Sequence, residues 1–280
     1  MEPLTHNSVD DHHDDFGGLT RDLPHLFNRR RALVMLGGAS LATVLAACGN
    51  NTSSDTTLAA DVNSTSSSSS PSSGNSGASI PDETQGPFPA DGTNGPNVLS
   101  ESGVVKKDIT TSFGSLSGTA EGIPLKISLT VVDASTGAAL PNSAMYIWHC
   151  TADGKYSIYE DASQNYLRGV QTTDAAGVVT FDSIFPGCYS GRWPHCHFEI
   201  YSSLAEATSG SQATKTSQLA LPEANCREAY ADSRYGNSAS NLDRLSLTSD
   251  NVFRDGWTDQ LATVTGDASS GYTATLLVRV

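Results

Sequence analysis

The chain has 280 residues, of which 30 are Asp or Glu and 16 are Lys or Arg, so its formal net charge is −14. An acidic chain is poorly suited to bind phosphate backbones, which argues against nucleic-acid recognition. No heptad repeat is sustained, which argues against a coiled coil, and the length allows one large β domain or two small ones.

Residues 1–47 are predicted to be an export signal. Arg29–Arg31 precede an apolar stretch from Ala32 to Ala47, which is shorter than the roughly 20 residues of a membrane span. The stretch ends in Leu-Ala-Ala before Cys48, which resembles a bacterial lipoprotein signal with Cys48 as the acylated residue. The adjacent arginines resemble a twin-arginine signal, although the usual aromatic residue after them is missing. An ordinary secretory signal with a chance cysteine, or a membrane anchor, are the alternatives.

These signals predict an exported protein, at the cell envelope or outside the cell, that meets the membrane only through a lipid on Cys48. Residues 48–79 are predicted to be a tether, because they are mostly Ser, Thr, Gly, Asn and Ala. Such a segment buries too little apolar surface to offset its ordering entropy. The folded domain is therefore predicted to span residues 80–280, without internal repeats.

Short strands dominate the predicted domain. Segments with strand patterns lie at 126–133, 144–149, 178–182, 195–201, 261–264 and 272–280, and turn sequences separate them. One short helix is predicted at 222–231, with Glu223 in its first turn. This pattern indicates an all-β fold, a β-sandwich of mostly antiparallel strands with long loops. No glycine-rich turn opens a helix, so a Rossmann or P-loop nucleotide site has no support.

The residues with metal-binding chemistry are concentrated between 186 and 197. Four of the seven histidines precede residue 48, so the domain keeps only His149, His195 and His197. His195 and His197 are two apart on a predicted strand, so their side chains point to the same face, with Cβ atoms about 7 Å apart. Two imidazoles so placed can bind one metal ion. His149 is predicted to be a packed histidine that hydrogen-bonds to the backbone.

The segment from Tyr189 to His197, Tyr-Ser-Gly-Arg-Trp-Pro-His-Cys-His, resembles the iron-ligand segment of the intradiol ring-cleavage dioxygenases. That family includes catechol 1,2-dioxygenases and protocatechuate 3,4-dioxygenases. Further segments similar to the family occur in family order at 81–88, 147–156, 167–174, 177–181 and 184–187. The resemblance covers about residues 81–201 well and the C-terminal strands loosely.

The resemblance implies a non-haem iron(III) site whose ligands are Tyr156, Tyr189, His195 and His197. Iron(III) is a hard cation that prefers anionic oxygen, and a phenol with a pKa near 10 loses its proton at neutral pH only beside such a charge. Arg192 matches the family arginine beside the pocket, where a fixed positive charge would stabilise electron-rich intermediates. Taken alone, Arg192 reads as a surface or packing arginine and Tyr156 as a packed turn residue.

The implied activity is oxidative cleavage of an aromatic ortho-diol of the catechol type. Both atoms of O2 are incorporated, the ring opens between the two hydroxylated carbons, and the product is a muconate-type diacid. Tyr189 would also serve as a base. The expected partners are a small aromatic diol and O2, with no nucleic acid.

Two departures from the family pattern leave the substrate and the oligomeric state open. Only five residues separate Tyr189 from His195, where the best-known enzymes carry a longer insertion, and this predicts a more open site. No helical N-terminal dimerisation domain is evident. The alternative function is a non-catalytic β-sandwich lipoprotein that binds an aromatic or glycan ligand at the cell envelope. The complete set of two tyrosines and two histidines favours the enzyme.

Four cysteines remain beyond Cys48, and an oxidising compartment permits them to form disulfides in any of three pairings. Cys196 lies between the two histidines, so strand alternation turns it away from the metal face. We predict two disulfides, Cys150 with Cys188 and Cys196 with Cys226, of which the first would join the two segments that carry the tyrosines.

Overall fold

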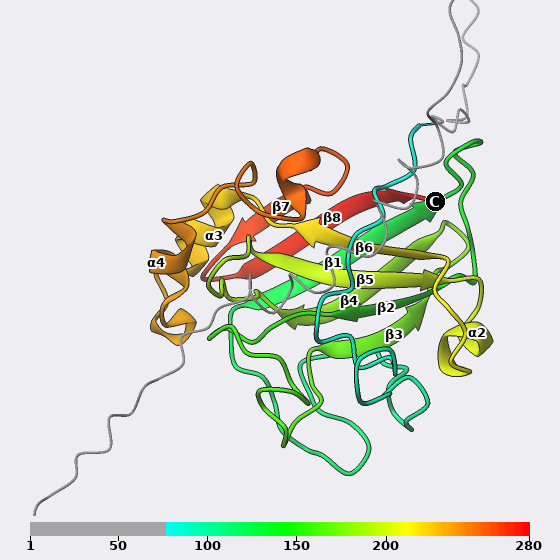
Figure 1. Ribbon diagram of the computed structural model, residues 1–280, viewed down its shortest axis with the longest axis horizontal. Coiled ribbons are helices and arrows are strands. Elements are labelled where there is room, and N and C mark those ends of the chain that lie inside the picture. Colours follow the sequence, from blue (N-terminus) through cyan, green and yellow to red (C-terminus); the bar gives the residue numbers. More distant parts are fainter. Residues whose placement is uncertain (1–76) are drawn as a thin grey trace, which may run out of the picture.

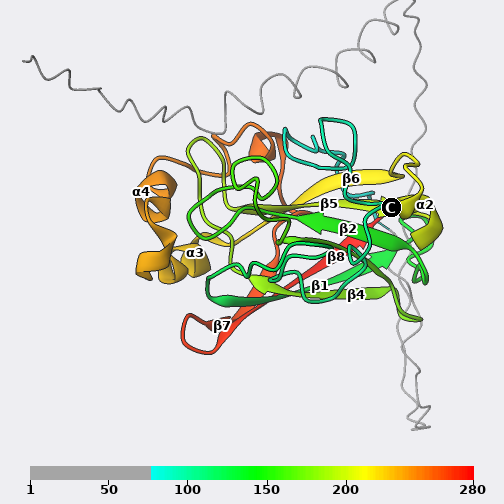
Figure 2. The ribbon, with the colours of Figure 1, turned by 90° about the horizontal axis from the view of Figure 1, so that it is seen from below.

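The computed structural model describes residues 77–280, so the predicted export signal, Cys48 and most of the predicted tether lie outside the described residues. The described part is a sandwich of two four-stranded sheets that face one another (Figures 1 and 2). The first sheet has the order β4 (Val178–Ile184), β1 (Pro124–Val132), β8 (Gly271–Arg279), β7 (Thr263–Asp267). The second has the order β3 (Arg168–Thr172), β2 (Ala144–Trp148), β5 (His195–Tyr201), β6 (Lys215–Ala220).

The strands are antiparallel except for the parallel pair of β1 and β8. In β1 the alternation predicted from the sequence is visible as burial, because Leu125, Ile127 and Leu129 point into the core while Lys126 is exposed. The all-β sandwich predicted from the sequence is confirmed. The strands β3 and β6 were not among the segments with a strand pattern.

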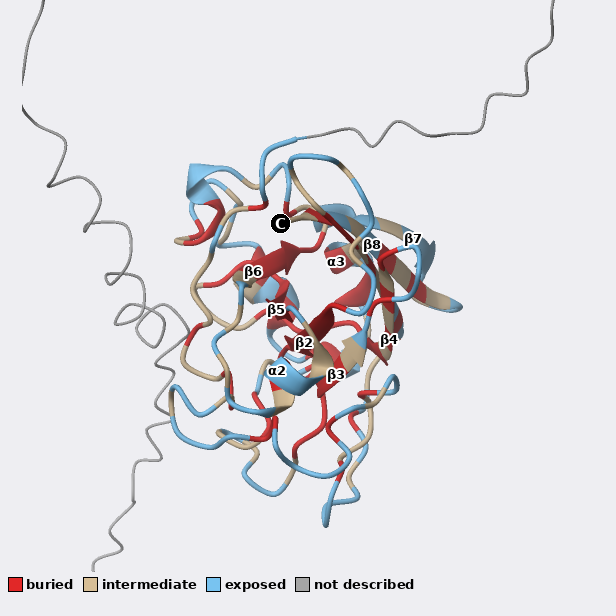
Figure 3. Ribbon diagram, turned by 90° about the vertical axis from the view of Figure 1, so that its right-hand side faces the viewer, coloured by how far each residue is buried: buried red, intermediate tan, exposed pale blue. Residues whose placement is uncertain are grey.

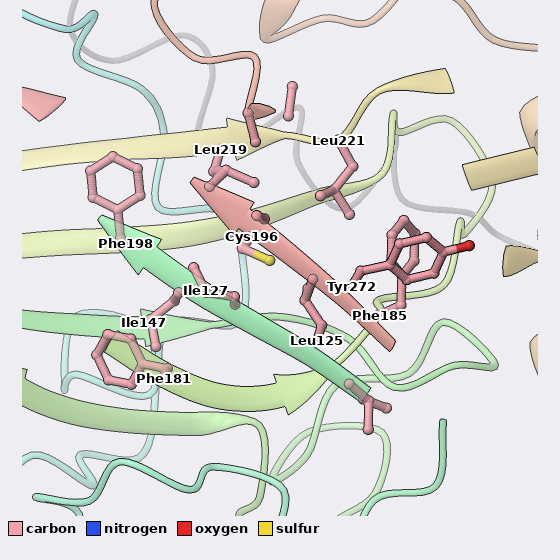
Figure 4. Close-up of a cluster of buried hydrophobic side chains, with 14 of the residues drawn as sticks. Leu125, Ile127, Ile147, Phe181, Phe185, Cys196, Phe198, Leu219, Leu221 and Tyr272 are labelled. Atoms are coloured by element: carbon pink, nitrogen blue, oxygen red, sulfur yellow. The ribbon is translucent and has the colours of Figure 1, made fainter. Parts of the chain in front are cut away.

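The second sheet is covered on both faces, and this positions the site. Along β5 every residue is buried. Cys196, Phe198 and Ile200 face the first sheet and belong to the main hydrophobic core, where Figure 4 shows the Cys196 sulfur among apolar side chains. The intervening residues, His197 among them, face the opposite side, which is covered by the long connecting segments. Figure 3 shows buried strands inside and exposed loops around them.

Three short α-helices lie at the ends of the sandwich: α2 (Leu204–Thr208), α3 (Glu223–Ala229) and α4 (Ser238–Leu242), with two 3₁₀ turns, η1 (Ser233–Tyr235) and η2 (Phe253–Asp255). The helix predicted at 222–231 corresponds to α3. The helices α2 and α4 were not predicted, because each has only five residues, too few to show an apolar period. None of the helices in residues 77–280 has the length and apolar character that a membrane span requires.

Candidate metal centre

The two histidines of β5 converge on one point. The His195 and His197 side chains leave the strand on the face opposite the main core, and their Nε2 atoms lie 3.0 Å apart. Both side chains are only 2% exposed. The His197 ring stacks on Trp148 of β2, with 4.9 Å between the ring centroids and 5° between the planes. The stack follows from the register, since Trp148 and His197 are directly opposite in the β2–β5 pair.

Both tyrosines predicted as ligands reach the same point from two separate loops. The Tyr189 hydroxyl, from the segment before β5, lies 3.4 Å from His195 Nε2. Tyr156, from the loop between β2 and β3, is 1% exposed and places its ring centroid 5.8 Å from that of Tyr189 and 6.3 Å from that of His197. The structure therefore brings together all four residues that the sequence predicted as ligands.

Two glycines allow the tyrosine-bearing loops to pack this closely. A Cβ atom on Gly154, whose φ is +85°, would lie 3.1 Å from the Tyr189 Cβ. A Cβ atom on Gly187 would lie 2.4 Å from the Ala152 carbonyl oxygen, closer than real Cβ atoms approach. The backbone of Gly187 instead donates a hydrogen bond of 3.0 Å to the Thr151 carbonyl. The absence of side chains at these two positions thus determines how near Tyr156 and Tyr189 can be.

The segment before Tyr189 is also held by helix α4. The Cys188 N–H donates to the Ser238 hydroxyl at 2.9 Å, and the Asn241 side-chain amide donates to the Cys188 carbonyl at 2.8 Å. The Tyr156 loop is closed in a similar way, since the Tyr156 N–H donates to a Glu160 carboxylate oxygen at 3.0 Å. Both tyrosines therefore stand on backbone that is fixed by side chains.

Burial keeps both histidines neutral. It lowers the pKa of His195 to about 3, helped by the positive charge of Arg192. It holds the pKa of His197 well below its ordinary value, helped by His195 and by the charges of Arg192 and Arg168. His195 Nδ1 donates its proton to the Trp193 carbonyl, so Nε2 carries a lone pair. Histidines that bind metals are typically neutral, and the ring nitrogen that does not face the metal donates its proton to a carbonyl or carboxylate.

The donor set fits a metal ion. If two nitrogens each lie about 2.1 Å from an ion and the N–ion–N angle is about 90°, they are about 3.0 Å apart. The two Nε2 atoms are separated by this distance, 3.0 Å. In residues 77–280 no group of three or more His, Cys, Asp and Glu side chains could hold a metal, so the zinc-type and two-histidine-one-carboxylate patterns have no support there. The remaining donors are the two phenols, which suit a hard, highly charged cation such as iron(III).

Arg192 is completely buried beside the histidines and is held by an acidic partner. Its Nε donates to Asp250 Oδ2 at 3.0 Å, and another guanidinium nitrogen donates to the Gln218 side-chain carbonyl at 2.6 Å. Asp250 also accepts the N–H of Trp193 at 2.7 Å. Burial alone would raise the pKa of Asp250, but the Arg192 charge and the N–H groups of Trp193 and Val252 hold it below its ordinary value. Arg192 is therefore an oriented cation within the site.

Asp250 and Gln218 were not found by sequence reasoning. Asp250 comes from a Ser- and Thr-rich turn before η2, and nothing in its neighbourhood distinguishes it from a solvent-facing turn residue. Gln218 lies opposite His197 in the β5–β6 pair, so the identification of β6 would have placed it on the metal face. The sequence can therefore predict the position of Gln218 once β6 is identified, but it does not predict that of Asp250.

The prediction for His149 is confirmed. Its Nδ1 lies 2.8 Å from its neighbour's carbonyl, that of Cys150, and its Nε2 lies 2.7 Å from the Ser183 hydroxyl. Burial lowers the pKa of His149 to about 4, so the ring is neutral. His149 is a hydrogen-bonded core residue, as the sequence suggested.

The two predicted disulfides are not present in the structure, which holds four free, buried thiols at Cys150, Cys188, Cys196 and Cys226. The Cys188 sulfur contacts the Arg192 carbonyl at 3.5 Å, and the Cys150 sulfur contacts the Gly187 carbonyl at 3.5 Å. Cys196 points into the core between the sheets. Strand alternation gave the correct side for Cys196, but pairing depends on the distances between loops, which the sequence does not contain.

Most of the candidate site is covered by other segments of the chain. Tyr189 is partly exposed, while Tyr156, Arg192 and both histidines are almost completely buried. The reason is that segment 81–89 lies over the metal face of the second sheet. Ser217 and Gln218 of β6 donate hydrogen bonds of 2.8 Å to the carbonyls of Pro81 and Thr84.

The comparisons with known proteins agree with this geometry. Residues 94–207 match a protein family described as "Dioxygenase", and the match includes Tyr156, Tyr189, Arg192, His195 and His197. Curated proteins include no match to the chain. Among solved structures, the chain is similar to an intradiol ring-cleavage dioxygenase from Tetranychus urticae, with 23% identity, a TM-score of 0.55, and coverage of 72% of this chain and 94% of that one.

A second solved structure, the dioxygenase Tetur07g02040, gives 22% identity, a TM-score of 0.56 and the same coverage of 72% and 94%. At these identities the two likenesses establish the fold, and the family match spans all of the predicted metal ligands and Arg192.

Proposed function

We propose that this chain is an intradiol ring-cleavage dioxygenase that holds a non-haem iron(III) ion and cleaves an aromatic ortho-diol with O2 to a muconate-type diacid, as the family match and the similar fold support. The observation that carries the proposal is the convergence of four side chains from three segments, with 3.0 Å between the two Nε2 atoms and 3.4 Å from the Tyr189 hydroxyl to His195. When bound, iron(III) would ionise the phenols and the diol and make the ring reactive toward O2.

The residues of the chain would supply binding, orientation and proton transfer. His195 and His197 would provide neutral nitrogen ligands, since burial keeps the pKa of each below its ordinary value. Tyr156 is buried and would be a permanent phenolate ligand. Tyr189 is the most exposed of the four, so it is the ligand that we expect to accept a proton from the incoming diol.

Arg192 would stabilise negative charge that develops on the substrate. Its guanidinium is buried, and Asp250 and Gln218 fix its orientation, so it needs no reorganisation during the reaction. The enclosing segment 81–89 would exclude water from the ring-opening step. The export signals in residues 1–47, which lie outside the described residues, support action at the cell envelope or outside the cell, with Cys48 as the lipid-bearing residue.

The test is the visible spectrum of the purified chain after loading with iron(III). Tyrosinate bound to iron(III) absorbs in the visible range, so we expect a coloured protein whose band shifts when catechol is added. Tyr156→Phe and Tyr189→Phe should each weaken the band, whereas Tyr235→Phe, which removes a hydroxyl bonded to the Phe185 carbonyl away from the site, should leave it unchanged.

Oxygen uptake with catechol, and incorporation of both atoms of labelled O2 into the diacid, would then measure the reaction. A colourless protein that takes up no iron would refute the proposal and would favour the alternative, a binding module built on the same sandwich.

A further inference from the structure

The solvent-facing side of the candidate metal centre is apolar and aromatic. Tyr156 and Trp148 belong to a second hydrophobic cluster, on the outer face of the second sheet, and four partly exposed side chains pack against that cluster near the site: Phe88, Ile158, Tyr159 and Tyr189. We call these four the apolar rim. The Phe88 ring lies 4.8 Å from the Tyr156 ring and 5.1 Å from the Tyr159 ring, measured between centroids, so the rim is continuous with the site.

One residue of the rim is held in a strained conformation. Ile158 has a φ of +75°, which is rare for a β-branched side chain. Its N–H donates to the carbonyls of Asp161 and Gln164, at 2.8 and 2.9 Å, and these bonds hold the strained turn. Such strain persists only where the surrounding structure imposes it, and it is concentrated at functional sites. The strained turn fixes Ile158 two residues from Tyr156, and its side chain packs against the hydrophobic cluster that contains Tyr156.

The cations that adjoin the site are already held by protein partners. Arg192 is paired with Asp250, with 3.0 Å between the charged atoms. Arg168, completely buried, donates to the Phe88 carbonyl at 2.7 Å and to the Ser157 carbonyl at 3.1 Å. Lys155 lies 2.9 Å from the Asp153 carboxylate. The proposed function already uses the Arg192 charge at the reacting ring, so a ring carboxylate would have to displace a partner of Arg168 or Lys155 to gain a counter-charge of its own.

The charge around the rim also opposes an anion. Glu160 and Asp161 follow the rim residues Ile158 and Tyr159 directly in the sequence, and the whole chain has a formal net charge of −14. A negatively charged substrate would therefore approach against a negative potential and would lose its hydration at an apolar rim. A neutral diol would meet neither penalty.

Resting on the proposed function, we propose that the site selects uncharged aromatic ortho-diols and discriminates against carboxylated ones, with Phe88 and Ile158 as specificity-determining residues. A ring substituent that lies against the rim should be apolar. A methyl group buried there would raise kcat/KM about fourfold, whereas a carboxylate left without a counter-charge would lower it about 100-fold or more.

The experiment uses the full-length, iron-loaded chain and three probes: catechol, 4-methylcatechol and 3,4-dihydroxybenzoate. Binding is measured from the shift of the visible band and turnover from oxygen uptake, each at low and high salt. We expect both neutral diols to shift the band and be cleaved, with 4-methylcatechol preferred. We expect 3,4-dihydroxybenzoate to bind about 100-fold more weakly, with a partial recovery at high salt that screens the negative rim.

A variant makes the test sharper. Ile158→Lys adds a cation to the rim and should raise the affinity for 3,4-dihydroxybenzoate relative to that for catechol about tenfold or more. Leu204→Lys is the matched control, because Leu204 packs against the same cluster but begins α2, at the opposite end of β5 from His195 (Figure 1). The control should change neither affinity.

The outcomes separate the two proposals. Equal affinity for the neutral and the carboxylated diols in the unmodified chain would overturn the selectivity while leaving the dioxygenase function intact. A visible band that none of the three diols shifts would overturn the function and the selectivity together. The comparison within the unmodified chain needs no variant, so a failure of Ile158→Lys to fold does not weaken it.

Discussion

Replacing Asp250 by alanine should destabilise the chain strongly, because Asp250 is the acidic partner of a buried arginine. Both side chains of the Arg192–Asp250 pair are 0% exposed. Asp250→Ala would leave the guanidinium buried without its counter-charge, which costs about 3–5 kcal/mol. It would also remove the acceptor of three backbone N–H groups, those of Trp193, Val252 and Phe253. We therefore expect a loss at or above the upper end of that range.

The measurement is urea unfolding of the metal-free chain, together with thermal unfolding. For a domain of about 200 residues, a loss of about 5 kcal/mol corresponds to a fall of roughly 10–20 °C in Tm. Asp250→Asn retains one acceptor oxygen and should lose less, about 2–3 kcal/mol. Asp182→Asn is the matched control, because Asp182 pairs with Lys107 and Lys126 at a side-chain exposure of 43%. The control should lose less than about 1 kcal/mol.

A double variant distinguishes an unpaired charge from lost packing. Arg192→Met combined with Asp250→Ala removes both charges, so the pair should lose less stability than the sum of the two single variants. The reasoning is refuted if Asp250→Ala loses no more than Asp182→Asn, or if the double variant is additive. Either result would mean that water or another group compensates Arg192.

Two further predictions concern other parts of the fold. Burial lowers the pKa of His149 to about 4 from an ordinary value near 6.5. As the pH falls, His149 therefore takes up its proton in the unfolded chain before it does so in the folded chain. The free energy of unfolding is thus unaffected by this group above about pH 6.5 and falls by about 3 kcal/mol between pH 7 and pH 4. Urea unfolding of His149→Gln at both pH values should lack this part of the acid sensitivity, and parallel curves for the two proteins would contradict it. Gly187→Ala should lose about 2 kcal/mol or more, because its Cβ would meet the backbone of Ala152 and Thr151. Gly210→Ala, which has open space but a φ of +82°, should lose about 1 kcal/mol, and equal losses would show that the loop contact is not decisive.

The elements with strong local patterns were predictable from the sequence. The strand β1 alternates apolar and polar residues, and β5 was predicted at His195–Tyr201, where it is found. The residue pattern alone did not indicate the strand β3, which only the family resemblance at 167–174 suggested, because Arg168-Gly-Val-Gln-Thr is short and opens with a cation and a glycine. Arg168 is nevertheless completely buried, since it donates to backbone carbonyls of two other segments. Only those distant acceptors make an arginine compatible with an inner strand.

The sequence before helix α2 contains a pattern that predicts the start of a helix. Ser203 accepts a hydrogen bond from the Glu206 N–H, which is the serine half of a capping box and can be read as Ser-x-x-Glu. Helix α4 has no side-chain cap, and its Ser238 and Asn241 instead bond to Cys188, which is 50 and 53 residues earlier in the chain. Helices of five residues are stabilised by such tertiary contacts, because their own nucleation is unfavourable.

In the candidate site, too, some residues can be predicted from local sequence and others depend on tertiary contacts. Tyr189, Arg192, His195 and His197 lie within nine residues, so their joint appearance in one loop and strand is a local property of the sequence. The groups that hold them come from elsewhere: Gln218 from β6, Ser238 and Asn241 from α4, and Asp250 from the turn before η2.

These supporting groups hold backbone and charges rather than a metal, so in principle many residue types and chain positions can supply them. A ligand has no such freedom, because the ion dictates both the donor atom and its position. A short motif is therefore enough to predict the chemistry of the site. Its rigidity depends on contacts with distant segments of the fold. Asp250 tests this division directly: a residue that touches no predicted ligand side chain should determine both the stability of the chain and the orientation of Arg192.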